Sequence, residues 1–228
     1  MKIGILITGH VAEALQAEHG NYDLMFRQFL AGHGFSFEAW YVVDGQFPRS
    51  PSEADGWLIT GSKHGVYEDH AWIDPLERLI RAIVADHLPL VGICFGHQII
   101  AQALGGHVEK FDGGWSVGRT TYQGERGPYI LNAWHQDQVI TPPDGARVLA
   151  SSDFCKYAML AIGDHVLTVQ PHPEFSPAYT ADLARVRGPG VVPDALLERA
   201  LLDIDGPNDN AVLAAEIAKH FNTARVPA

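Results

Sequence analysis

Cysteine is scarce in this sequence of 228 residues, which contains only Cys94 and Cys155. Small secreted domains depend on many disulfides, so we expect two reduced thiols and a cytoplasmic protein.

Metal-binding patterns are missing as well: there is no His-Glu-x-x-His or Cys-x-x-Cys, and His64, His70 and His107 have no partner at metal spacing. We therefore expect neither a metal ion nor an organic cofactor.

Basic residues are also few, with 16 Lys and Arg against 27 Asp and Glu and a net charge of −11. A phosphate backbone needs a basic surface, so we expect no nucleic-acid partner. No apolar run approaches the roughly 18–20 residues that span a bilayer, and no small-residue cleavage site follows the N-terminal MKIGILITGH. The length suits one α/β domain over residues 1–228.

Short apolar segments alternate with helical patterns in the first half of the chain. We expect strands over 2–8, 35–43, 56–60 and 89–93, and helices after Asn21, over 73–86 and over 97–104. This alternation predicts a doubly wound, mostly parallel central sheet with flanking helices.

The second half changes rhythm. Short strand-like segments predict an added antiparallel hairpin region, over 108–111, 118–123, 129–140, 147–151, 156–162 and 165–170. Helical patterns follow over 176–187, 193–202 and 210–221.

Cys94 stands in a pattern typical of a nucleophile. The apolar run 89–93 predicts a buried strand, and 97–104 continues as a helix. A thiol between Gly92 and Gly96 at such a junction is the cysteine version of the nucleophile elbow, where larger flanking side chains would collide. The helix N-terminus favours thiolate over thiol, so Cys94 is a candidate nucleophile. The alternative is an ordinary buried cysteine.

A nucleophilic cysteine needs a base, and the chain has twelve histidines. The stretch 165–170 predicts a strand whose carboxyl end delivers His172 and Glu174. Prolines on both sides of the histidine keep the chain extended, so these two side chains point the same way and Glu174 can orient the imidazole. Because crevices of parallel sheets lie at the carboxyl ends of strands, we expect His172 to meet Cys94 there. Alone, Pro-His-Pro-Glu would be interpreted as a rigid surface turn.

Attack on a carbonyl also requires donors for the developing negative charge. The amide of Phe95, directly after the thiol, is one candidate. Gly61 and Ser62 follow the predicted strand 56–60 and can supply the other, since a glycine-containing loop leaves amides free. An ordinary loop is the alternative there. Trp115, in a glycine-rich segment, indicates a further loop near the site.

Residues 92–98 (Gly-Ile-Cys-Phe-Gly-His-Gln) and 171–174 (Pro-His-Pro-Glu) together resemble the class I (triad) glutamine amidotransferases, over nearly the whole chain. The resemblance implies a flavodoxin-like fold and an enzyme whose cysteine attacks the γ-carboxamide of glutamine, giving a γ-glutamyl thioester and ammonia. It implies that Cys94 is the nucleophile, His172 the base and acid, and Glu174 the residue that orients the imidazole. Outside the two motifs, it implies that the amides of Ser62, with Gly61 before it, and of Phe95 are the oxyanion donors.

The resemblance also implies a pocket for glutamine or a γ-glutamyl compound. Residues 134–137 resemble the Ser-His-Gly-Asp stretch of the GMP-synthetase amidotransferase domain, whose backbone reads the α-amino and α-carboxylate groups. The implied pocket residues are Gln98, Trp134, His135, Gln136 and Asp137. Two departures stand out: 61–63 reads Gly-Ser-Lys instead of Gly-Gly-Pro or Gly-Pro-Gly, and Gln136 replaces a glycine.

Neither a synthetase domain nor a P-loop follows, so the chain resembles stand-alone, GMP-synthase-like members. Our first hypothesis is hydrolysis of the glutamine amide, with ammonia released or passed to a separate synthetase. The second is a γ-glutamyl peptidase or hydrolase. The third is a non-catalytic glutamine-sensing module, against which the intact triad argues. A PfpI-type protease ranks last, because it does not require Pro-His-Pro-Glu.

Overall fold

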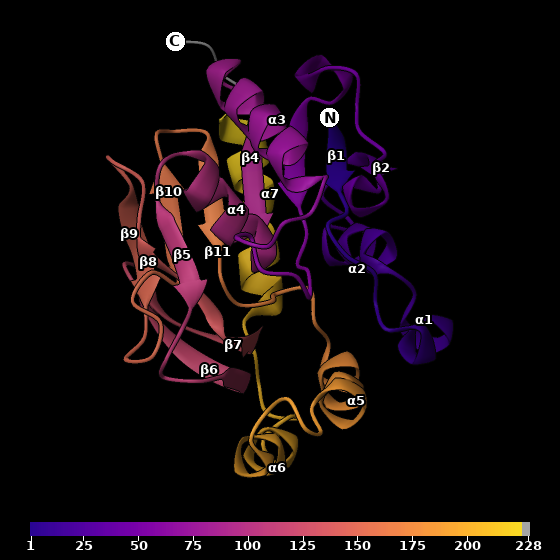
Figure 1. The fold of residues 1–228 in the computed structure, drawn as a ribbon, viewed down its shortest axis with the longest axis vertical. Coiled ribbons are helices and arrows are strands. Elements are labelled where there is room, and N and C mark those ends of the chain that lie inside the picture. Colours follow the sequence, from indigo (N-terminus) through magenta and orange to yellow (C-terminus); the bar gives the residue numbers. More distant parts are fainter. Residues whose placement is uncertain (225–228) are drawn as a thin grey trace.

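The computed structural model describes residues 1–224, which form an α/β fold around a nine-stranded central sheet (Figure 1). The strand order is β2-β1-β3-β4-β11-β10-β9-β6-β7, and β5 pairs with β8 separately. The strands are β1 (Lys2–Leu6), β2 (Ser36–Trp40), β3 (Gly56–Ile59), β4 (Leu90–Ile93), β5 (His107–Lys110), β6 (Ser116–Gly124), β7 (Gly127–His135), β8 (Asp137–Thr141), β9 (Arg147–Ser151), β10 (Met159–Ile162) and β11 (Val166–Val169). The helices are α1 (Glu13–His19), α2 (Tyr22–Phe29), α3 (Ile73–Ala85), α4 (Phe95–Ala103), α5 (Pro177–Arg187), α6 (Asp194–Leu202) and α7 (Asn210–Thr223).

The first five strands in the sheet order, from β2 to β11, run parallel. Every residue of β3, β4 and β11 is buried, as expected for parallel strands covered on both faces. In Figure 1, α3 and α4 lie in front of these strands and α7 lies behind them. Leu76, Ile80 and Ile83 of α3 recur at helical spacing and pack into the core on that side. The predicted doubly wound architecture is confirmed.

The other side of the sheet is antiparallel, from β11 through β10, β9 and β6 to β7. The prediction of one strand over 129–140 is wrong. The chain forms β7 and β8 with Gln136 between them, and β8 leaves the central sheet to pair with β5. Both pieces have strand-like composition, which does not reveal that the pairing partner changes.

Several predicted boundaries also shift. The strand expected over 35–43 ends at Trp40, because Val42–Asp44 form a 3-10 turn closed by Gly45. The helix expected after Asn21 is α2; the side chain of Asn21 caps it by accepting the amide of Tyr22 at 3.0 Å, and the helix ends at Phe29. The remaining predicted helices agree with α3, α4, α5, α6 and α7 to within two residues.

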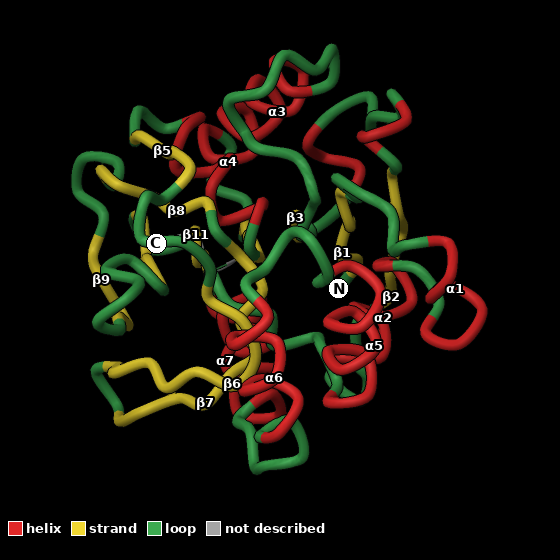
Figure 2. Tube along the Cα trace, turned by 60° about the horizontal axis from the view of Figure 1, so that its bottom comes forward, coloured by secondary structure: helices red, strands yellow, loops and turns green. Residues whose placement is uncertain are grey.

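Helices α5 and α6 lie together at one end of the molecule, at the bottom of Figure 1 and toward the viewer in Figure 2. Val117 of β6 packs against Leu197 and Ala200 of α6 in a small separate core. Among residues 1–224, no helix combines the length and apolar character needed to cross a membrane.

The junction between β4 and α4 is too crowded for any side chain at two positions. A Cβ at Gly92 would overlap the carbonyl of Gly96, and a Cβ at Gly96 would overlap the carbonyl of Ile59 in β3. Both obstacles are backbone atoms, which cannot rotate away. The glycines that flank Cys94 are therefore required by close packing, as the sequence predicted.

We expect Gly96→Ala to lower the free energy of unfolding by about 3 kcal/mol, at the upper end of overpacking effects. Alanine is the better helix former by up to about 1 kcal/mol, but the backbone overlap outweighs this gain. Urea unfolding measures the change. Leu202→Ala, at a position 90% exposed, is the control and should change the stability by less than about 0.5 kcal/mol. Equal stability of the Gly96 variant and the wild type would contradict the crowding.

Candidate active site

Cys94 directly follows the carboxyl end of β4, and its backbone is held in place by neighbouring strands. Its φ of 53° is in the left-handed region, which costs a non-glycine residue about 1–3 kcal/mol. The Cys94 amide donates to the carbonyl of Val169 in β11 (2.8 Å), and the Gly96 amide donates to that of Thr60, just after β3 (3.1 Å). The two neighbouring strands therefore hold the strained junction on both sides.

His172 reaches the same edge because β11 pairs directly with β4, with Val169 opposite Ile93. The amide of His172 donates to the carbonyl of Asn132 in β7 (2.8 Å). Its imidazole stacks on Phe175, with the ring centroids 3.9 Å apart and the planes nearly parallel. Both the backbone and the ring of His172 are thus fixed.

Glu174 lies beside the imidazole, as the extended Pro-His-Pro-Glu segment predicted. Its Oε1 is 2.7 Å from Nδ1 of His172, and the side chains are 0% and 4% exposed. A buried carboxylate on Nδ1 fixes the ring orientation and leaves Nε2 for another partner.

Gly61, in the loop after β3, lies against both Cys94 and His172. A Cβ built at Gly61 would lie 2.8 Å from Cε1 of His172 and 3.7 Å from Cβ of Cys94. Both side chains therefore approach one point of this loop. A larger residue at position 61 would displace the imidazole.

Charge interactions favour the protonated form of His172. Burial by itself lowers its pKa, but the charges of the Cys94 thiolate and the Glu174 carboxylate outweigh burial and raise the pKa from 6.5 to about 10. The other thiol differs: burial raises the pKa of Cys155 to about 12. At neutral pH, Cys155 is a protonated core thiol, whereas Cys94 faces an imidazolium.

Three amides near the thiol are free to bind an anion. The amides of Gly61, Ser62 and Phe95 donate to no acceptor within residues 1–224. Phe95 opens α4, where amides have no partner inside the helix. The Thr8 hydroxyl donates to the Gly61 carbonyl (3.0 Å), and the Ser62 hydroxyl donates to the Thr8 carbonyl (2.7 Å). These bonds fix the loop without using its amides.

A cavity of about 280 Å³ opens beside Cys94 and His172. Its wall includes every residue that the sequence predicted for the pocket, together with Ser62 and Trp115. The predicted pocket residues are Gln98, Trp134, His135, Gln136 and Asp137.

Hydrogen bonds of Gln98 and Asp137 connect the segments that form the wall of this cavity. Nε2 of Gln98 donates to the carbonyl of Asp137 (2.9 Å) and to Oε1 of Gln170 (3.0 Å). The hydroxyl of Tyr67, from the segment after β3, donates to Oδ2 of Asp137 (3.0 Å). Burial raises the pKa of Asp137, while the hydrogen bond from Tyr67 and the charge of Lys110 lower it. This network joins β8, α4 and the segment after β3.

Sequence reasoning missed several residues of the cavity. They are isolated charged or aromatic side chains from separate segments, and no local pattern marks them: Tyr22, Lys63, Tyr67, Lys110, Tyr179 and Arg187. The expectation that His64 and His70 have no partner at metal spacing is wrong, because each offers a ligand atom that lies within 4.8 Å of the other and of a Glu68 oxygen.

Comparison with known proteins identifies the family to which this chain belongs. The model of the family "Glutamine amidotransferase class-I" matches residues 42–182. γ-Glutamyl peptidase 4 of Arabidopsis thaliana is 30% identical over 92% of this chain and 90% of its own length. One component of the glutamine-hydrolysing GMP synthase of Halobacterium salinarum is 29% identical over 58% of this chain and 73% of its own.

Among solved structures, the glutamine amidotransferase of Methylobacillus flagellatus superposes with a TM-score of 0.75 at 19% identity, covering 99% of this chain and 93% of that one. This likeness shows the fold. The family match over residues 42–182 establishes that the chain belongs to the class I glutamine amidotransferases.

We expect the imidazole of His172 to stay protonated from pH 6 to 9, because a raised pKa keeps the proton on the ring until the pH nears about 10. Cys94→Ser removes the strongest interaction that raises this pKa, so the titration should move to lower pH. Long-range ¹H–¹⁵N correlation spectra of the imidazole nitrogens measure both titrations.

His135 is a built-in reference for this experiment. Burial and the charge of His172 lower its pKa to about 3, so His135 should remain neutral over the same range. Titration of His172 near 6.5 in the wild type, or identical titration in Cys94→Ser, would contradict the ion pair.

Proposed function

We propose that this protein hydrolyses the amide bond at the γ-carbonyl of a glutamyl group through a thioester on Cys94. The observation that supports this most directly is the convergence of Cys94, the His172–Glu174 pair and the free amides of the Gly61 loop at one sheet edge. A nucleophile, an oriented base and oxyanion donors are the parts that acyl transfer requires.

In the first step, Sγ of Cys94 attacks the γ-carbonyl carbon, and the carbonyl oxygen takes up the negative charge. The amides of Phe95 and of Gly61 or Ser62 stabilise this oxyanion. The C–N bond then breaks, and His172 donates its proton to the departing nitrogen. The ring begins the reaction protonated, in keeping with its raised pKa.

In the second step, the neutral imidazole takes a proton from water, and the hydroxide attacks the thioester. The C–S bond breaks, glutamate leaves, and the thiolate and imidazolium return. Glu174 holds Nδ1 throughout, so that Nε2 exchanges the proton. Gln98 and residues 134–137 bind the α-amino and α-carboxylate groups of the glutamyl unit.

Glutamine is the first candidate substrate, with ammonia as the leaving group. The ammonia is released or passed to a separate synthetase, and residues 1–228 act as a single amidotransferase-like domain. The similarity to a component of a glutamine-hydrolysing GMP synthase supports this assignment.

γ-Glutamyl peptides are the second candidate. The wall of the cavity also includes Trp115, Leu183, Arg187 and Val191, which the glutamyl unit does not require and which can contact a leaving group larger than ammonia. The similarity to γ-glutamyl peptidase 4 over 92% of the chain favours this candidate as well.

Incubation with glutamine and with γ-glutamylalanine should reveal the intermediate and the preferred substrate. Mass spectrometry of the rapidly quenched protein should show an adduct of about 129 Da, one glutamyl unit, on the peptide that contains Cys94. Cys94→Ser should keep the fold and lose the adduct together with turnover. Wild-type turnover in Cys94→Ser would exclude the thiol from the mechanism, and turnover of neither substrate by the wild type would contradict the proposal.

His172→Ala should remove nearly all activity, and Glu174→Ala should retain about 10- to 100-fold more than His172→Ala, since misorientation costs less than loss of the proton carrier. Steady-state kcat on the better substrate measures the difference. Gln136→Ala, in the same cavity but outside the proposed triad, is the matched control and should mainly change KM. Equal, complete loss in the His172 and Glu174 variants would show that Glu174 does more than orient the ring.

A further inference from the structure

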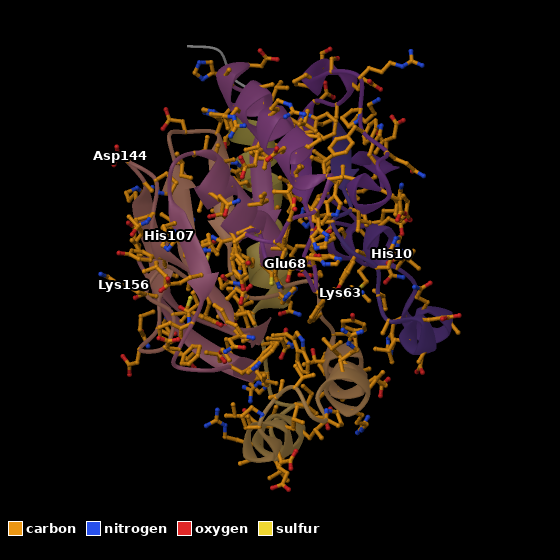
Figure 3. All side chains as sticks on the ribbon, viewed as in Figure 1. His10, Lys63, Glu68, His107, Asp144 and Lys156 are labelled. Carbon is orange, nitrogen blue, oxygen red and sulfur yellow. The ribbon has the colours of Figure 1, made fainter. Side chains whose placement is uncertain are left out.

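The segment between β3 and α3 forms part of the rim of the cavity and brings two imidazoles and a carboxylate together. His64 and Glu68 line the cavity, and His70 lies beside them. Figure 3 places the labelled Glu68 and Lys63 near the middle of the view. The three side chains of the cluster are between 22% and 43% exposed, so an ion from solvent can reach them.

Glu68 contacts both imidazoles of this cluster. Oε2 of Glu68 is 3.3 Å from Nδ1 of His64 and 2.7 Å from Nε2 of His70, and the three atoms all lie within 4.8 Å of one another. Tetrahedral ligands at zinc distances of about 2.0–2.2 Å are separated by about 3.3–3.6 Å. Small side-chain rotations would bring the three atoms to this spacing.

We propose that His64, Glu68 and His70 bind one divalent transition-metal ion, for which Zn²⁺ is the chemical prototype. Two imidazoles and one carboxylate are a donor set that Zn²⁺ accepts, and the exposed side of the cluster leaves a fourth position for water. The metal ion displaces any proton shared by Glu68 and the imidazoles and satisfies all three side chains at once.

An aromatic contact positions one of the proposed ligands. The ring of His70 stacks on Trp72, with the ring centroids 5.7 Å apart and the planes at 10°. This contact holds one ligand in place against the start of α3.

A second cluster of similar size, formed by Glu18, His19 and Asp182, is a weaker candidate. It offers a single imidazole, which already pairs with Asp182 at 2.9 Å. Asp182 also accepts from Arg185 at 2.9 Å, so a positive charge already occupies its surroundings. The His64 cluster has two imidazoles and no such bond from an arginine among residues 1–224.

The position of the proposed ion connects it to the candidate active site. The amide of His64 donates to the hydroxyl of Ser62 (3.2 Å), and Ser62 contributes a candidate oxyanion donor. An ion that joins His64 to His70 would therefore fix the segment that carries this donor. The binding site itself stands on the geometry of its three ligands and does not depend on the proposed reaction.

The proposal is tested by titrating the metal-free, full-length protein with Zn²⁺ and measuring the heat of binding by isothermal calorimetry. Cys94 and His172 could bind Zn²⁺ themselves, so the titrations use Cys94→Ser as the parent. We expect one equivalent to bind. Adding His64→Ala or His70→Ala should weaken binding at least about 100-fold, more than the 10- to 100-fold typical of losing an outer-shell partner. Absorption of bound Co²⁺ should report a site of low coordination number.

Two matched controls keep the interpretation specific. Nε2 of His107 lies 3.4 Å from Oε2 of Glu109, and within residues 1–224 no second imidazole joins this pair in a metal-binding group. His107 is labelled to the left of Glu68 in Figure 3, and His107→Ala should bind Zn²⁺ like the parent. His19→Ala removes the competing cluster and should also leave binding unchanged. Circular dichroism confirms folding of every variant. Absence of binding by the parent, unchanged binding in both His64→Ala and His70→Ala, or loss of binding in His19→Ala would overturn the proposal.

Discussion

The parallel pairing of β4 with β11 is the constraint on which the site depends. Cys94 and His172 are 78 positions apart in the sequence numbering, yet each follows one of these two strands. The register places Val169 opposite Ile93, and the amide of Cys94 continues the ladder to Val169. A shift of this register would separate the thiol from the imidazole. The antiparallel half then contributes β7, which holds the backbone of His172 at Asn132.

Local patterns predicted the elements that are defined by their own residues. The buried strands, the glycines around Cys94 and the extended Pro-His-Pro-Glu segment all follow from short-range sterics and periodicity. The split between β7 and β8 could not be foreseen, because it depends on which strand lies opposite. Likewise, Lys110 and Arg187 reach the cavity only through tertiary packing, and neither stands in a motif.

The cluster of His64, Glu68 and His70 likewise could not be predicted from local sequence patterns. The common metal-binding motifs have fixed spacings along the chain, whereas His64, Glu68 and His70 meet in an irregular segment between β3 and α3 whose turns set their separation. The aromatic side chain of Trp72 and the packing of Val66 into the core shape that segment. Three-dimensional proximity here is a product of the loop conformation, which sequence spacing alone does not specify.

The backbone at Cys94 has one more consequence. A residue with a side chain in this conformation is less favourable than glycine, which adopts positive φ freely. The fold tolerates this conformation because the ladder to β11 and the contact with Thr60 hold it. Glycine at position 94 should therefore give a thermally more robust protein, one that lacks the nucleophile of the proposed reaction. Under that proposal, activity and stability place opposite demands on this one residue.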